Sequence, residues 1–161
     1  IGVHKFYADP ARGDKRLALF ATKDGISGER EGMAIYKCNE NTGYLLLSSQ
    51  GDTTVKVYPR EGDPGDPHQH NLLMTIKTNG AVETDGLDVT SVSTSADFPH
   101  GFLISHNSSG KNFRLYAWED IAQTNLKICP AEIGADDKPI NVPTEFALEQ
   151  NNPNPFKVLM R

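Results

Sequence analysis

Pairs of acidic residues stand directly before two glycines of the chain. Glu29 and Glu31 precede the first glycine, and Glu83 and Asp85 precede the second, 54 residues further on. Each glycine is followed by a short apolar run that is typical of a β-strand. One such pair alone would also be typical of a turn, because Asp, Glu and Gly are favoured in loops. Its recurrence indicates a repeated structural position.

Carboxylates gathered at one place could bind a hard cation. Like charges held close together are costly unless a cation or a proton lies between them. Ca²⁺ takes about six to eight oxygen ligands in flexible geometry. Gln50 and Asn107 each end a later apolar run, and we interpret them as matching positions of the repeat. Their side-chain amides would be metal ligands or hydrogen-bond partners of the ligands. Asn and Gln in turns are an equally good explanation. The candidate metal ligands are Glu29, Glu31, Gln50, Asp85 and Asn107.

The elements that must position these residues are short strands. The apolar runs are rich in β-branched and aromatic residues and are separated by Gly, Asn, Asp and Ser, which predicts an all-β fold. Residues 118–126 alone could hold a helical turn or two. The predicted strands are residues 4–8, 16–22, 32–38, 43–50, 53–59, 72–78, 87–93, 101–107 and 112–118.

The repeat predicts a β-propeller of four-stranded antiparallel blades. "GYLLLSSQG" (43–51) matches "GFLISHNSS" (101–109), and the period of 54 to 58 residues suits such a blade. A β-sandwich with hairpins that are similar by chance remains the alternative. Residues 28–78 would form one blade, 85–126 most of a second, and 4–22 the outer strands of a third. Because a ring needs about four to eight blades, we expect the missing ones from a longer parent chain or another copy.

Composition excludes some classes of protein. The formal net charge of −5 argues against a nucleic-acid partner, because phosphate backbones are bound mainly by Lys and Arg. No run approaches the roughly 18 apolar residues of a membrane span. The chain starts at Ile1 without Met or a signal peptide, so we expect a longer N-terminus.

Two other patterns favour ordinary structural roles. Cys38 and Cys129 permit one disulfide but have no metal-binding or redox spacing, and two unrelated buried thiols are the favoured interpretation. The two histidines of "HQHN" (68–71) could form a metal pair, but their Pro- and Gly-rich surroundings favour an exposed turn.

Several segments together resemble one protein family. "VHKFYADP", "EGMAIYKCNENTGYLLLSSQGDTTVKVYPR", "ETDGLDV" and "NFRLYAWEDIA" are similar to the C-terminal portion of bacterial β-propeller phytases, the calcium-dependent alkaline 3-phytases. The most specific part is the acidic strand followed by "SSQG", with Gln50 placed 19 residues after Glu31. The resemblance covers roughly residues 1–126.

The resemblance implies a six-bladed propeller that hydrolyses phosphate monoesters of phytate, myo-inositol hexakisphosphate, or of other inositol phosphates. Several Ca²⁺ ions would bridge the substrate phosphates and activate water. Glu31 and Asp85 match metal-binding residues that serve catalysis, and Glu29, Gln50 and Asn107 match further positions near the metals. Residues that contact phosphate would precede Ile1, so we expect the isolated chain to be inactive or nearly so. The alternative is a non-catalytic propeller segment that binds calcium or a partner.

The C-terminal part of the sequence has a different character. Residues 127–142 lose the strand pattern and are interpreted as a linker. "PTEFALEQNNPNPFKVLMR" (143–161) resembles the start of the C-terminal sorting domain of type IX secretion substrates. This second resemblance implies a secreted or cell-surface protein.

Overall fold

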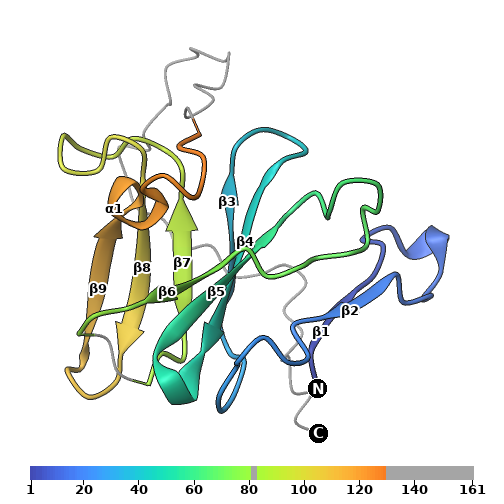
Figure 1. Cartoon of the computed structure of the whole chain (residues 1–161), viewed down its shortest axis with the longest axis horizontal. Helices are drawn as coiled ribbons and strands as arrows, with labels where there is room; N and C mark the ends of the chain where they lie inside the picture. The colour runs from blue at the N-terminus through green and yellow to red at the C-terminus, as the bar shows by residue number, and fades with distance from the viewer. Residues whose placement is uncertain (81–82, 130–161) are drawn as a thin grey trace, which may run out of the picture.

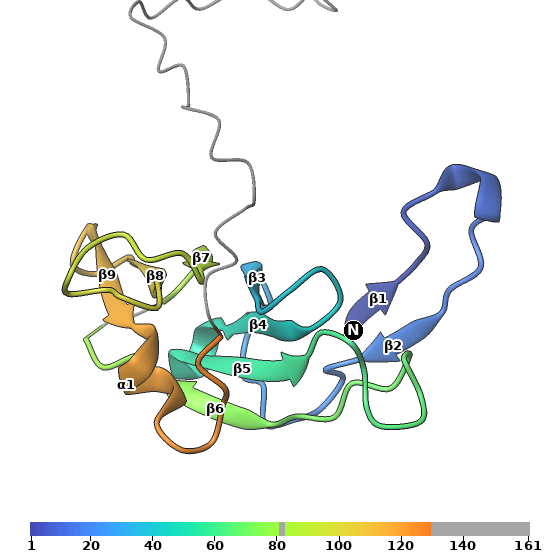
Figure 2. The same cartoon turned by 90° about the horizontal axis from the view of Figure 1, so that it is seen from above.

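The computed structural model describes residues 1–80 and 83–129. Its described part contains three antiparallel sheets, which lie next to one another with the second sheet in the middle (Figures 1 and 2). The strands are β1 (Val3–Lys5), β2 (Ala18–Phe20), β3 (Met33–Lys37), β4 (Gly43–Ser49), β5 (Thr54–Pro59), β6 (Met74–Lys77), β7 (Leu87–Thr90), β8 (Phe102–Asn107) and β9 (Asn112–Ala117). The helix α1 (Trp118–Ala122) follows β9, and single 3-10 turns occupy Pro10–Arg12 and Gln50–Asp52.

The sheets confirm the predicted division into blades. The first pairs β1 with β2, the second has the order β3-β4-β5-β6, and the third has the order β7-β8-β9. Every pair of neighbours is antiparallel and consecutive in sequence. This meander is the structure of a propeller blade, so the described residues form a partial β-propeller with one complete blade. The helix α1 falls within the segment 118–126, as expected.

The second blade is buried on both faces. Along β5 all six residues are buried, whereas β3 alternates between exposed and buried positions. One face of the blade contacts the first sheet, where the rings of Phe20 and Tyr58 meet edge to face with centroids 5.3 Å apart. The other face contributes Val55 and Val57 to a core shared with the third sheet. A blade between two neighbours therefore needs apolar residues at both alternate positions.

Two aromatic rings dominate the core between the second and third blades. Tyr36 of β3 and Trp118 of α1 are fully buried, and their rings stack with centroids 3.6 Å apart. The Tyr36 hydroxyl donates a hydrogen bond to the carbonyl of His100 at 3.0 Å. Burial raises the pKa of Tyr36 to about 12, so this hydroxyl keeps its proton and remains a donor.

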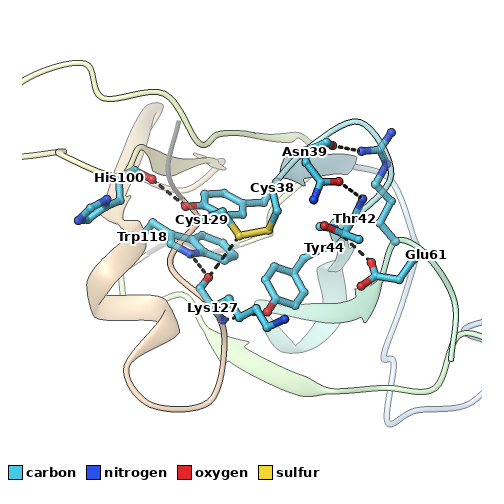
Figure 3. Close-up of a disulfide and its surroundings, with 12 residues drawn as sticks. Cys38, Asn39, Thr42, Tyr44, Glu61, His100, Trp118, Lys127 and Cys129 are labelled. Carbon is cyan, nitrogen blue, oxygen red and sulfur yellow. Dashed lines mark hydrogen bonds between the residues drawn. A yellow bond between two sulfur atoms is a disulfide. The ribbon is translucent and has the colours of Figure 1, made fainter. Parts of the chain in front are cut away.

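A disulfide closes this core at one end. After α1 the chain turns back to the second blade, where Cys129 is bonded to Cys38 (Figure 3). The Trp118 indole donates to the carbonyl of Lys127 at 3.1 Å, and the Lys127 amide donates to the Tyr44 hydroxyl at 2.8 Å. The prediction of two unrelated thiols is wrong. The cysteines are 91 positions apart, and the sequence between them gives no sign of the return, which depends on packing around Trp118.

These contacts include the first residues of the predicted linker, 127–129, in the folded structure. The remainder of that linker, to residue 142, and the segment 143–161 lie outside the described residues. Neither predicted boundary beyond residue 129 is therefore tested. In the described part of the chain, no helix is long and apolar enough to cross a membrane.

The disulfide leads to a stability prediction. Replacing Cys38 and Cys129 together by Ser should lower the free energy of unfolding by about 2–4 kcal/mol, because the bond restricts the unfolded chain. Urea unfolding followed by fluorescence of Trp118, the single tryptophan, measures this directly. Reductant should shift the midpoint of the unsubstituted protein and leave the double variant unchanged. Identical midpoints for both proteins without reductant would refute the prediction.

Candidate functional site

The predicted acidic residues meet where β3 and β7 begin. The carboxyl of Glu31 is hydrogen-bonded to Asp85, which raises the pKa of Glu31 above its ordinary value. Glu31 is exposed, and some desolvation and the neighbouring Glu29 raise its pKa further. The second and third blades thus contribute acidic groups to one cluster. We call Glu29, Glu31, Gln50, Asp85 and His106 the acidic cluster.

Two nitrogen-bearing side chains flank the carboxylate of Asp85. The side-chain amide of Gln50 donates from Nε2 to Oδ1 at 2.9 Å, and Nδ1 of His106 lies 3.4 Å from Oδ2. Gln50 follows β4 of the second blade, while His106 belongs to β8 of the third. The pairing of Gln50 with Asp85 brings together two predicted site residues. His106 was not predicted, and its place beside Asn107 in "SHN" was the only available signal.

The backbone of the first acidic pair is held by the end of β4. The hydroxyl of Ser48 accepts hydrogen bonds from the amides of Glu31, at 3.0 Å, and Gly32, at 2.8 Å. The amide of Gln50 donates to the carbonyl of Glu29 at 3.2 Å. Ser48 was not among the predicted site residues, although it belongs to the "SSQG" motif. The fixed spacing of that motif from Glu31 reflects these bonds.

Gly32 explains why a glycine follows the first acidic pair. A Cβ added at Gly32 would lie 2.7 Å from the backbone nitrogen of Leu87, which is closer than such atoms approach. Glycine is therefore required where the second and third blades meet. At Gly86, the matching position of the third blade, an added Cβ would meet nothing within 4 Å among the described residues.

The second acidic pair flanks a buried threonine. Thr84 lies between Glu83 and Asp85 and accepts a hydrogen bond from the Ser105 hydroxyl at 3.2 Å. Glu83 is exposed and has a left-handed backbone, with φ of 50°. Anchoring of Thr84 therefore fixes the segment that presents Asp85 to the cluster.

Asn107 does not occupy the repeat position that was predicted for it. The strand register makes Gln50 correspond to Ser108, and Ser49 correspond to Asn107. The matching of Gln50 with Asn107 is therefore wrong by one residue, and side chains one residue apart point to opposite faces of a sheet. Asn107 is buried and donates to Oδ1 of Asn112 at 2.9 Å, across the β8–β9 turn. Its role as a metal ligand stays a prediction.

Of the two histidines in the "HQHN" segment, His68 lies in a turn, whereas His70 lies after the turn and is buried. Lys5 Nζ, which can only donate when charged, lies 3.0 Å from Nε2 of His70, and Nδ1 of His70 lies 2.7 Å from the carbonyl of Pro59. Nε2 therefore accepts and Nδ1 donates, which requires a neutral ring. Burial lowers the pKa of His70 accordingly. Both ring nitrogens are engaged, and the expectation of an exposed turn is wrong for this residue.

The chemistry of the acidic cluster fits a hard cation, but the ligand set is incomplete. Carboxylate oxygens are the ligands that Ca²⁺ prefers, and carboxyl groups as close as Glu31 and Asp85 need a proton or a cation between them. Across residues 1–80 and 83–129, no three His, Cys, Asp or Glu side chains are grouped as a metal site. Further ligands would have to come from outside the described residues.

The blades and the acidic cluster together define a partial β-propeller with the donor chemistry of a cation site. Comparison with known proteins agrees with this class. The model of the family described as Phytase matches residues 1–140. The 3-phytase of Bacillus subtilis (strain 168) is 30% identical over 130 residues, which are 75% of this chain and 34% of that protein. The chain belongs to the phytase family, and it spans about a third of the length of this relative.

Crowding of the carboxylates leads to a prediction about pH. The pKa of Glu31 is raised by folding, so its ionised form destabilises the folded protein above that pKa. The penalty disappears as the pH falls below the ordinary value of 4.5. Glu31→Gln should therefore raise the thermal unfolding midpoint in a metal chelator at about pH 7, with the gain lost near pH 4.

Glu40→Gln provides the matched control for this measurement. Glu40 is paired with Lys37 at 2.6 Å, and the hydrogen bond from Lys37 lowers the pKa of Glu40. The same substitution should therefore give no stabilisation there at neutral pH. A lower midpoint for Glu31→Gln in chelator at neutral pH would show that the cluster is not under electrostatic strain.

Proposed function

We propose that the protein containing this chain is a calcium-dependent 3-phytase, which hydrolyses phosphate monoesters of phytate. The observation that carries the proposal is the contact between Glu31 and Asp85, two carboxyl groups from different blades. Membership of the phytase family and similarity to a protein named 3-phytase support the choice of substrate. Other inositol phosphates offer the same phosphate chemistry and are included in the proposal.

An acidic cluster can bind a polyanion only if positive charge is supplied to it. The whole chain carries a formal charge of −5, and Glu29, Glu31 and Asp85 add local negative charge. When bound, Ca²⁺ would link these carboxylates to substrate phosphates, polarise the attacking water and stabilise charge on the leaving oxygen. Phosphate and carboxylate would then share the same cations rather than repel each other.

The residues of the chain have separate tasks in this proposal. Glu31 and Asp85 hold the cation, with Glu29 as a further ligand. Gln50 orients Asp85 through its 2.9 Å hydrogen bond, and Ser48 fixes the backbone that carries Glu31. Asn107 stays a predicted ligand of a separate calcium ion. Each task concerns the position of charge, which is the main catalytic requirement of phosphoryl transfer.

The described blades contribute only part of the proposed site. The first and third sheets have fewer strands than the second among the described residues, and the related 3-phytase is about three times as long as the matched region. We expect the residues that contact phosphate and the remaining calcium ligands to come from further blades. The 161-residue chain alone should therefore release phosphate from phytate at a rate near the buffer background.

We further propose that the protein is exported. The disulfide between Cys38 and Cys129 supports this, because such bonds persist mainly in oxidising compartments. The similarity of residues 143–161 to a type IX sorting signal points in the same direction, although these residues lie outside the described part.

A non-catalytic calcium-binding propeller is the second candidate. It would use the same contact between Glu31 and Asp85 to bind Ca²⁺, without the residues that contact phosphate. The two candidates differ in turnover. Both require Ca²⁺ at the acidic cluster, whereas only the enzyme releases phosphate.

Phosphate release from phytate by the full-length protein tests the proposal. We expect activity with Ca²⁺ and none after chelation. Glu31→Gln and Asp85→Asn should each lower kcat by about 100-fold, because loss of a charged ligand weakens stabilisation by the metal by several kcal/mol. Glu40→Gln, on the β3–β4 turn, should leave kcat unchanged. Activity that survives chelation would refute the calcium dependence, and calcium binding without any turnover would support the non-catalytic candidate.

A further inference from the structure

His106 occupies the position in the third blade that Ser48 occupies in the second. The His106 amide donates to the carbonyl of Gly86 at 2.9 Å, and the Ser48 amide donates to the carbonyl of Gly32 at 2.8 Å. The two residues are therefore the last but one of equivalent strands, beside equivalent glycines. Their side chains can be compared directly as supports for the acidic residue that precedes each glycine.

The two supports act on different parts of the acidic residue. Ser48 holds the backbone, because its hydroxyl accepts from the amides of Glu31 and Gly32. The larger imidazole of His106 reaches the side chain of Asp85, where Nδ1 lies 3.4 Å from Oδ2. In the second blade, Ser48 thus fixes the backbone of Glu31. In the third blade, Nδ1 of His106 lies beside the side-chain carboxylate of Asp85.

The nitrogen that faces Asp85 is buried and has no hydrogen-bond partner in the described structure. Buried polar atoms without partners are rare, because each costs part of its hydration energy. The separation from Asp85 Oδ2 is slightly longer than an ordinary N–H···O bond of about 2.7–3.2 Å. The ring of Phe113 lies beside the imidazole, with centroids 5.8 Å apart. A small rotation of the Asp85 carboxylate would supply the missing acceptor.

After such a rotation, Asp85 would have one donor on each oxygen. Gln50 donates to Oδ1 at 2.9 Å, and His106 lies beside Oδ2. A carboxylate oxygen has two lone pairs, so each oxygen keeps one for a cation. Two donors from different strands fix the plane of the carboxylate, whereas one donor would leave it free to turn.

We propose that His106 is a positioning residue for the cation site: with Gln50, it fixes the Asp85 carboxylate so that the free lone pairs of both oxygens are available beside Glu31. This inference rests on the proposed function, because it assumes a cation at the acidic cluster. His106 acts through Asp85 and is not itself a ligand, since Ca²⁺ is bound by oxygen and imidazole suits transition metals. Only a proton on Nδ1 is required.

Calorimetric titration of the full-length protein with Ca²⁺ tests this role. His106→Leu removes the donor, whereas His106→Asn can place an amide donor where Nδ1 lies. We expect His106→Leu to weaken calcium affinity about tenfold, the usual effect of losing a partner of a metal ligand, and His106→Asn to remain within about threefold of the unsubstituted protein. His106→Ala, which removes the ring without adding apolar bulk, should match His106→Leu.

His68→Leu is the matched control. Nδ1 of His68 is also buried without a hydrogen-bond partner, but His68 lies in the connection between β5 and β6. Calcium affinity should not change in this variant. Thermal unfolding in chelator, measured for every variant, separates a loss of ligand orientation from a loss of folding.

The outcomes distinguish this inference from the proposed function. An unsubstituted protein that binds no Ca²⁺ overturns both. Calcium binding that is equally strong in His106→Leu and His106→Ala overturns the positioning role alone. Equal weakening in His106→Asn and His106→Leu also overturns it, because the donor would then not matter. Weakening by Leu and Ala with rescue by Asn supports the assignment.

Discussion

Repulsion between carboxyl groups at the start of β3 and β7 is the constraint on which the rest of this structure depends. Glu31 and Asp85 come from different blades, and the hydrogen bond between them raises the pKa of Glu31. Close approach of the blades requires Gly32, because a side chain there would collide with Leu87. Gln50 crosses from the second blade to Asp85 in the third. These features hold carboxyl groups close together, an arrangement that requires a proton or a cation between them.

At the opposite end of β3, the same two blades are joined by uncharged contacts. Tyr36 stacks on Trp118, and Cys38, one residue after β3, is bonded to Cys129. Burial of aromatic surface and the disulfide supply stability that the acidic end lacks. The strand β3 therefore runs between a stabilising end and a strained end. This division is common in proteins, because functional groups are rarely arranged for stability.

Much of this arrangement could be predicted from the sequence, and the failures have physical reasons. The repeat of acidic pairs and the strand pattern predicted the two, four and three strands of the sheets, because alternation and turn residues are local signals. The repeat predicted that Gln50 and Asp85 would lie on the same rim, and the structure joins them by a hydrogen bond. The disulfide was missed because it depends on the return of the chain after Trp118. Asn107 was assigned to the wrong position because a shift of one residue is invisible without the register, and the same error concealed His106.

We propose that Glu31 and Asp85 hold one calcium ion between two blades of the propeller. The most direct measurement is a crystal structure of the full-length protein grown with Ca²⁺, with anomalous diffraction data to identify the ion. The account predicts an anomalous peak coordinated by both carboxylates, with the Gln50 amide still donating to Asp85. A map in which saturating Ca²⁺ leaves this position empty, with Glu31 and Asp85 still hydrogen-bonded to each other, would contradict it.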